Sequence, residues 1–374
     1  MVVATYLLLV IRSLEDLAIA EIQEKLEVVS IEVLTLQADP ERKHRLDVER
    51  GQAAVGKLVV HTTSSPERVK SLCSVQAFLA YIAHSDALTT TDEVAGPEQI
   101  ATLVEQSSRW NDALVLWKLH VPSTESSIRF RASCVRDGTH KYSSEVIAGK
   151  VGAAIVRKFH WTVSLVDFDL EVVAIVMHHD VICGISLAAD PKTINFRGAR
   201  LAPEPRRLAS FQYMSTLRPS TAYLMLQLAT CNAGDVVLDC MCGVGTIPAC
   251  SSHWAPVFGL GGDVSPDAVA QARVNLQQSP RAAVCLWSSE RLPLRPESVD
   301  RILVDMPFGI QCGNATKNSR LYPKALQEMA RVLRPNGTAV LLVLSKKMLE
   351  HSVRNAPSLT IQKDLVVNIG GQTI

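Results

Sequence analysis

Hydrophobic positions along the chain follow strand and helix periodicities in succession. The apolar run Val2–Ile11 predicts a strand, and apolar residues at helical spacing within Leu14–Val28 predict a helix directly after it. Further along, Ser144–Phe159 has helical spacing, whereas Leu114–His120 and Leu170–Met177 have the continuous apolar character of buried strands. Together these segments predict an α+β arrangement for the first half of the chain.

Changes in this pattern mark the domain boundaries. We expect a ferredoxin-like α+β region over residues 1–75 and a second α+β domain over residues 76–190. Residues 191–217 carry three prolines and read as a linker. From residue 218 to residue 374, short apolar runs alternate with helical segments, which predicts a doubly wound α/β sheet. A ligand of such a sheet lies beyond the carboxyl ends of its strands.

Composition excludes several classes of protein. With 47% hydrophobic and 20% charged residues, the chain can bury enough apolar surface to fold. Its longest apolar runs are far shorter than the roughly 20 residues of a membrane-spanning helix, and no secretory signal is expected at the N-terminus. Nine cysteines, an odd number spread over the chain, fit reduced thiols in the cytosol or nucleus better than a disulfide framework.

The net charge of the whole chain is only +1, but individual segments are strongly charged. Residues 1–50 carry a net charge of −4, whereas residues 129–161 and residues 192–218 each carry +5. Basic stretches of this kind contact nucleic-acid phosphates, although a solvated charged face is the plain alternative. The candidate RNA-binding residues are Arg129, Arg131, Lys192, Arg197, Arg200, Arg206 and Arg207.

A glycine loop follows the first strand of the C-terminal region. Asp239 ends that strand, and Gly243 and Gly245 permit a ligand to approach the backbone closely. Pro248 stands where the dinucleotide fingerprint has Gly or Ala, and no lysine follows to make a phosphate loop. Because a carboxylate would repel a pyrophosphate, Asp239 favours a ligand that has an ammonium group and no phosphate. S-adenosylmethionine is such a ligand.

Two further features lie beside this loop. Asp263 ends the second strand, where a carboxylate can accept hydrogen bonds from ribose hydroxyls or can simply cap the turn. Cys240 and Cys242 form a C-x-C pair without a second pair of ligands, which is a poor spacing for zinc, so we expect no metal site.

The fourth strand of this region ends in Asp305-Met306-Pro307-Phe308, which resembles the [D/N]-P-P-[Y/F] motif of methyltransferases that modify planar amino groups. A side-chain acceptor and a backbone carbonyl can bond both hydrogens of such an amine and direct its lone pair at a methyl donor. We assign these roles to Asp305 and to the carbonyl of Met306, with Pro307 stiffening the turn and Phe308 stacking on the base. Met306 stands where proline is usual, which loosens the backbone. A strand-end acid beside a core Phe is the alternative.

Several segments together point to one known family. They are Leu217–Tyr223, Asp305–Gly309, Leu321–Pro323 and Val367–Gly371 in the C-terminal half and Ile128–Cys134, Phe159–Trp161 and Asp167–Val172 in the middle. The C-terminal half resembles the THUMP-associated RNA guanine methyltransferases, and the middle resembles a THUMP domain. The resemblance implies a class I methyltransferase domain behind ferredoxin-like and THUMP domains. It also implies a cytoplasmic enzyme that forms N2-methylguanosine near the start of the tRNA acceptor stem, at position 6 or 7, by direct in-line transfer from S-adenosylmethionine. A small zinc-binding activator subunit would dock on the catalytic domain.

Site residues follow from the same resemblance. By position, Gly243 and Asp263 contact the cofactor, Ser220 lies near it, and Asp305 handles the base with Phe308. Ser288 stands where an Asp usually bonds the adenine amine, and it could accept one weaker bond there. Three alternatives stay open: a guanosine of U6 small nuclear RNA as substrate, an adenine or glutamine amine as substrate, and a catalytically weak RNA-binding protein.

Overall fold

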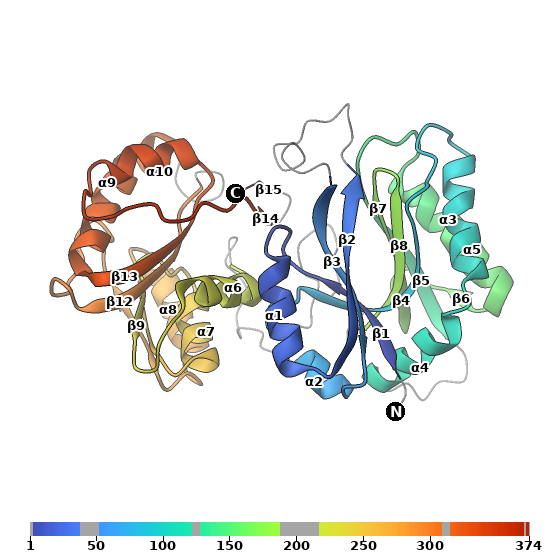
Figure 1. Cartoon of the computed structure of the whole chain (residues 1–374), viewed down its shortest axis with the longest axis horizontal. Coiled ribbons are helices and arrows are strands. Elements are labelled where there is room, and N and C mark those ends of the chain that lie inside the picture. The colour runs from blue at the N-terminus through green and yellow to red at the C-terminus, as the bar shows by residue number, and fades with distance from the viewer. Residues whose placement is uncertain are drawn as a thin grey trace. The chain divides into compact units, whose positions relative to one another are not determined.

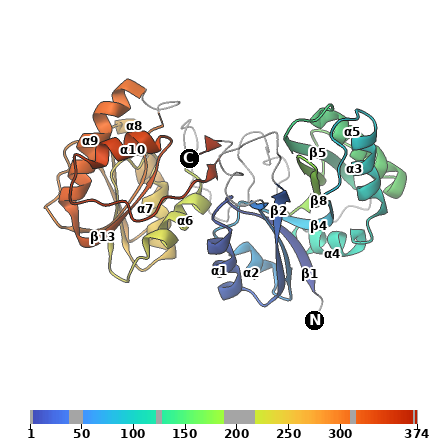
Figure 2. The same ribbon diagram turned by 45° about the horizontal axis from the view of Figure 1, so that its top comes forward.

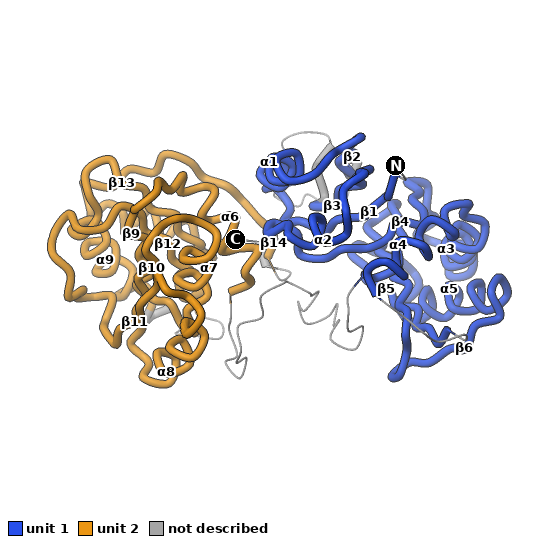
Figure 3. Tube along the Cα trace, turned by 90° about the horizontal axis from the view of Figure 1, so that it is seen from below, with its two compact units in different colours: residues 1–205 blue, residues 206–374 orange. Residues whose placement is uncertain are grey.

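A computed structural model of the chain describes residues 3–37, 52–121, 128–187, 217–308, 315–369 and 372–373. The chain divides into two compact units, residues 1–205 and residues 206–374 (Figure 3). This division falls within the predicted linker, most of which lies outside the described residues.

Unit 1 contains one eight-stranded sheet with the strand order β2-β3-β1-β4-β8-β7-β5-β6. The sheet continues from the predicted ferredoxin-like region into the predicted THUMP region, because β4 pairs with β1 on one side and with β8 on the other. The boundary after residue 75 therefore stays a prediction. The strands are β1 (Ala4–Leu9), β2 (Val28–Gln37), β3 (Gln52–Thr62), β4 (Ala77–Ser85), β5 (Arg129–Asp137), β6 (Thr162–Val163), β7 (Leu170–Met177) and β8 (Asp180–Ser186).

The helices of unit 1 cover one face of this sheet (Figures 1 and 2). Each of them contributes apolar residues to a single core that also contains Tyr6 and Leu8 of β1. These helices are α1 (Glu15–Lys25), α2 (Pro66–Lys70), α3 (Ala95–Gln106), α4 (Trp110–His120) and α5 (Ser144–Phe159). The strands predicted near the N-terminus and at Leu170–Met177 and the helix predicted at Ser144–Phe159 are thus present.

The strand predicted at Leu114–His120 is wrong, because these residues form the last two-thirds of α4. Trp110, Ala113 and Trp117 recur at helical spacing and are all buried, which places them on one face of the helix against the sheet. The indole of Trp110 also donates a hydrogen bond of 2.6 Å to the carbonyl of Val104. Burial of this helical face outweighs the strand preference of the apolar run.

Unit 2 contains a parallel five-stranded sheet with the order β11-β10-β9-β12-β13. Its strands are β9 (Val236–Asp239), β10 (Phe258–Asp263), β11 (Ala282–Leu286), β12 (Val299–Asp305) and β13 (Leu333–Leu342). The helices are α6 (Pro219–Ala229), α7 (Thr246–Trp254), α8 (Pro266–Asn275), α9 (Ala315–Val332) and α10 (Lys346–Val353), and β14 (Asn368–Ile369) pairs with β15 (Gln372–Thr373). The predicted doubly wound sheet is confirmed.

Helices lie on both faces of this second sheet. Apolar side chains of α6 and α7 pack with Val237 and Leu303 in one core. Apolar side chains of α9 pack with Leu238 and Ile302 in another core (Figure 1). The strand order reverses between β9 and β12, so the crevice that binds ligands in such sheets is expected at the carboxyl ends of these two strands. Among the described residues, no helix is long and apolar enough to cross a membrane.

Candidate active site

Three carboxylates meet at the carboxyl edge of the unit 2 sheet. Asp239, Asp263 and Asp305 end β9, β10 and β12, which are neighbours in the sheet. Burial raises the pKa of Asp239 well above its ordinary value, and the charges of Asp305 and Asp263 raise it further. The structure thus brings the motif acid to the same edge as the glycine loop, and the edge favours a cationic ligand.

The glycine loop is fastened to the end of β10. The backbone N–H of Cys242 donates to the carbonyl of Gly262 at 2.9 Å, and that of Gly243 donates to Oδ2 of Asp263 at 2.9 Å. Gly243 and Gly245 have φ values of +52° and +85°, a region in which a side chain is strained. A Cβ on Gly243 would meet no atom within 4 Å, so open space lies above the loop backbone.

Asp263 caps the turn as well as facing the site. Its Oδ1 accepts from the N–H of Ser265 at 2.9 Å, while Oδ2 accepts from the glycine loop. A carboxylate oxygen can accept a second bond, and the residue is only half-buried, so ribose hydroxyls could still be bound. The two roles considered for Asp263 from the sequence are therefore compatible.

Asp305 offers an acceptor that the described part of the chain leaves unused. Its Oδ1 is buried and has no hydrogen-bond partner among the described residues, although the residue as a whole is only half-buried. Burial raises the pKa of this carboxyl to about 7. Since buried polar atoms in proteins are nearly always paired, this oxygen is suited to a ligand N–H.

Replacing Asp305 with Asn should stabilise the ligand-free protein above pH 7. The folded-state pKa lies above the unfolded value of about 4, so the buried carboxyl contributes stability below pH 4 that is lost as the pH rises through 7. Removing the charge recovers up to roughly 4 kcal/mol at pH 8. Thermal melts of both proteins from pH 4 to pH 8 check this. A difference that does not shrink toward pH 4 would contradict it.

The backbone of the motif is held on both sides. Met306 is 1% exposed, and its N–H donates to the carbonyl of Leu342 at 3.0 Å. The carbonyl of Pro307 accepts from Nδ2 of Asn318 at 2.5 Å and from the hydroxyl of Tyr322 at 3.0 Å. Sequence reasoning missed both donors. Tyr322 lies in a segment that supports the family resemblance, but nothing in the sequence links its hydroxyl to this carbonyl.

The remaining cofactor candidates differ in their surroundings. Ser288 is exposed, and its Oγ accepts from the N–H of Glu290 at 3.3 Å, so it already caps a local turn. Ser220 is buried in the first turn of α6. Beside it in sequence, Thr221 has a buried hydroxyl without a partner among the described residues, as does Thr246 in the first turn of α7. Thr246 directly follows Gly245 of the glycine loop, so its hydroxyl is a candidate donor to a ligand carboxylate.

Two neighbouring features complete the site. The indole of Trp287 donates to the carbonyl of Cys240 at 3.3 Å, and a Cβ on Gly262 would lie 1.9 Å from that ring, so only glycine fits there. Cys240 and Cys242 are buried free thiols, and burial raises the pKa of both. In the described part of the chain, no group of three or more His, Cys, Asp or Glu residues could hold a metal ion.

The candidate RNA-binding residues of β5 are engaged in ion pairs within unit 1. Arg129 contacts Asp167 at 2.5 Å and Asp169 at 2.9 Å. Arg131 contacts the buried Glu171 at 2.6 Å, and its guanidinium lies over a neighbouring Phe ring. Their role in RNA binding stays a prediction. The other candidates lie outside the described residues: Lys192, Arg197, Arg200, Arg206 and Arg207.

Known proteins are similar to this chain in sequence and in fold. Residues 206–373 match a family model described as the RMKL-like methyltransferase domain. The tRNA (guanine(6)-N(2))-methyltransferase THUMP3 of Bos taurus is 34% identical over 65% of this chain and 49% of the relative. The U6 snRNA (guanine-N(2))-methyltransferase THUMPD2 of Bos taurus is 32% identical over 59% of this chain and 41% of the relative. The chain thus spans about half the length of the curated relatives it matches.

A solved structure extends the likeness to both units. The crystal structure of TrmN from Thermus thermophilus aligns with 99% of this chain and 97% of its own length, with a TM-score of 0.69 and 22% identity. The predicted fold class, with a class I methyltransferase domain at the C-terminus, is confirmed. The resemblance to RNA guanine methyltransferases that the motifs indicated is confirmed by the sequence relatives.

Proposed function

We propose that this chain, whose residues 206–373 match the RMKL-like methyltransferase domain, methylates the 2-amino group of a guanosine in the acceptor stem of tRNA. One observation carries the assignment: at the edge where the glycine loop leaves open space, Asp305 has a buried acceptor atom without a partner among the described residues. The name of the THUMP3 relative supports guanine N2 and tRNA as the substrate class.

The cofactor is S-adenosylmethionine, which when bound supplies a methyl group on a positively charged sulfur. The three carboxylates at the ends of β9, β10 and β12 support the binding of its positive charges, and we assign the ribose hydroxyls to Asp263. The buried hydroxyls of Thr221 and Thr246 suit its carboxylate. Ser220 lies beside Thr221 in the first turn of α6. The Oγ of Ser288 already accepts a bond from the N–H of Glu290, so it retains one weaker acceptor position for the adenine amine.

Direct transfer then depends mainly on positioning by the chain. Asp305 accepts one hydrogen of the guanine amine and the carbonyl of Met306 accepts the other, which turns the nitrogen lone pair toward the methyl group. Phe308 stacks on the base, which must leave its helical stem to reach the site. The new N–C bond forms as the S–C bond breaks, and the amine loses a proton. With a pKa near 7, Asp305 can take that proton and release it to water.

The partner proposed for unit 2 is a small zinc-binding activator subunit. In the described part of the sheet, β11 is an edge strand, and edge strands accept an added strand from another chain. Leu286, the last residue of β11, is 56% exposed, and an added strand would lie beside it. The cytoplasmic location that the family resemblance implies belongs to the same proposal.

U6 small nuclear RNA is the second candidate substrate, because the THUMPD2 relative is named for it. Purified chain with the activator should be given unmodified tRNA transcripts and, separately, U6 RNA. We expect N2-methylguanosine in the acceptor stem of tRNA, identified by nucleoside mass spectrometry and site mapping. Methylation of U6 RNA alone would select the second candidate. Methylated adenine or protein glutamine would overturn the guanine assignment, and cofactor binding without transfer would indicate an RNA-binding protein.

A further inference from the structure

Two side chains of α9 hold one carbonyl of the motif. Asn318 and Tyr322 both donate to the oxygen of Pro307, and they are 3% and 2% exposed. They lie four residues apart and therefore on the same face of the helix. If the Pro307 peptide rotated, two buried donors would lose their acceptor, which folded proteins strongly avoid.

The opposite side of the motif is tied to the sheet. The N–H of Met306 donates to the carbonyl of Leu342, so the β12–β13 pairing continues for one bond beyond Asp305. A proline, the usual residue at this position of the motif, has no N–H and could not make that bond. The dipeptide Met306–Pro307 is thus fixed by β13 at its amide and by α9 at its carbonyl.

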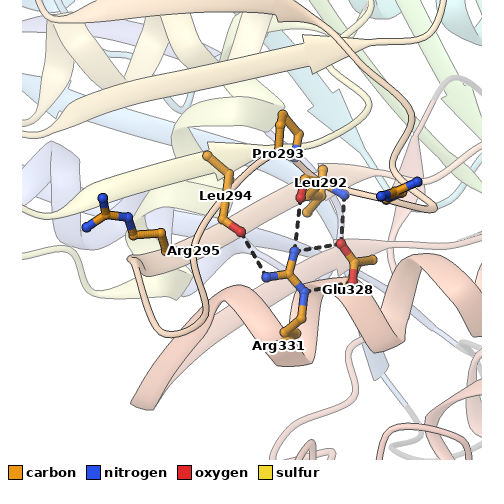
Figure 4. Close-up of a pocket in the computed structure, with 7 residues that line it drawn as sticks. Leu292, Pro293, Leu294, Arg295, Glu328 and Arg331 are labelled. Atoms are coloured by element: carbon orange, nitrogen blue, oxygen red, sulfur yellow. Dashed lines mark hydrogen bonds and ion pairs between the residues drawn. The ribbon is translucent and has the colours of Figure 1, made fainter.

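The helix that supplies the two donors is itself anchored. Arg331 pairs with Glu328 at 2.7 Å and donates to the carbonyls of Leu292 and Leu294 at 3.0 Å and 2.8 Å (Figure 4). Glu328 in turn accepts from the N–H of Leu292 at 2.7 Å. Core residues of α9 pack around Tyr322 on the same helix. Asn318 and Tyr322 therefore extend from a helix that is held in place by its own contacts.

We propose that Asn318 and Tyr322 are positioning residues that hold the Met306–Pro307 backbone in one conformation. They thereby keep the Met306 carbonyl and the Asp305 carboxylate at the spacing needed to bind both hydrogens of an amine. This inference rests on the proposed function. It also explains how the chain tolerates Met306: hydrogen bonds on both sides supply the stiffness that a second proline ring gives elsewhere. Burial and the charge of Asp305 raise the pKa of Tyr322 to about 12, so its hydroxyl stays a donor at working pH.

The test is removal of each donor with its shape retained. Tyr322→Phe and Asn318→Leu should each lower kcat by about 10-fold, and the double variant by more, because a small misplacement at the reacting centre is costly. The affinity for S-adenosylmethionine, measured by calorimetry, should not change. Tyr142→Phe is the matched control: its buried hydroxyl donates to the carbonyl of Thr89 at 2.8 Å in unit 1, so it loses an equivalent bond without touching the motif.

Hydrogen exchange gives a readout that does not depend on turnover. The Met306 amide should exchange faster in Tyr322→Phe than in the parent, and at the parental rate in Tyr142→Phe. Parental kcat in Tyr322→Phe and Asn318→Leu would overturn the inference while leaving the proposed function intact. An equal loss of kcat in Tyr142→Phe would overturn it too, because the effect would then be general destabilisation. A parent protein that transfers no methyl group to RNA would instead overturn the proposed function.

Discussion

Asp305→Ala should abolish most methyl transfer while cofactor binding persists. In the proposed mechanism the carboxylate is the acceptor that orients the amine, and removing one such preorganised group costs about 10²–10³-fold in kcat. The rest of the site depends little on it, since its Oδ1 has no hydrogen-bond partner among the described residues. Single-turnover transfer from labelled S-adenosylmethionine measures the rate, and calorimetry measures the affinity.

Asp305→Asn is the matched variant for this experiment. An amide oxygen still accepts a hydrogen bond, so transfer should survive in part, as the Asn found in the related motif implies. The proposed mechanism needs an ionised carboxylate in the parent protein, so kcat/KM should fall as the pH drops below about 7. The kcat/KM of Asp305→Asn should not show this fall, because the amide does not titrate. If Asp305→Ala transfers the methyl group at the parental rate, the acceptor role proposed for Asp305 is wrong.

Asp263→Ala should weaken cofactor binding by about 100-fold, since hydrogen bonds to a charged group contribute roughly 1.5–3 kcal/mol each. We propose that Asp263 supports the site in two ways: it would bind the ribose, and it accepts from the N–H groups of Gly243 and Ser265. Its loss removes a ligand contact and loosens the glycine loop together. Calorimetric titration with S-adenosylmethionine measures the change.

Asp267→Ala serves as the control for this variant. Asp267 is an exposed acid in the first turn of α8, four residues from Asp263, and its removal changes the net charge equally. We expect parental affinity from it. If both variants bind the cofactor equally well, the ribose assignment of Asp263 is wrong, and if both bind it equally weakly, the effect is one of overall charge.

The parts of the site that depend on local chain chemistry could be predicted from the sequence. A glycine loop after a strand requires residues that tolerate positive φ, and Gly243 and Gly245 supply them. Strands that alternate with helices place Asp239, Asp263 and Asp305 at one edge, because parallel strands all point the same way. These features need no knowledge of distant contacts.

What the sequence could not show are contacts between residues far apart in the chain. The bond from Tyr322 to the carbonyl of Pro307 joins a side chain to a backbone atom, and backbone acceptors carry no residue signature. Arg129 meets Asp169 across 40 residues, so its charge looked free in the sequence. The strand predicted wrongly within α4 has the same cause. Trp117 is buried against strands that are far from it in the sequence, so the residues around it do not show which of its neighbours are buried with it.

The ion pairs on β5 change how binding to a polyanion should respond to ionic strength. A cation that already has a carboxylate beside it holds few mobile counterions, so a phosphate that approaches it displaces few of them. Arg129 and Arg131 therefore add less to the salt slope than their formal charges suggest, and they serve better as oriented donors than as a source of long-range attraction. Attraction over distance then falls to basic residues elsewhere in the chain.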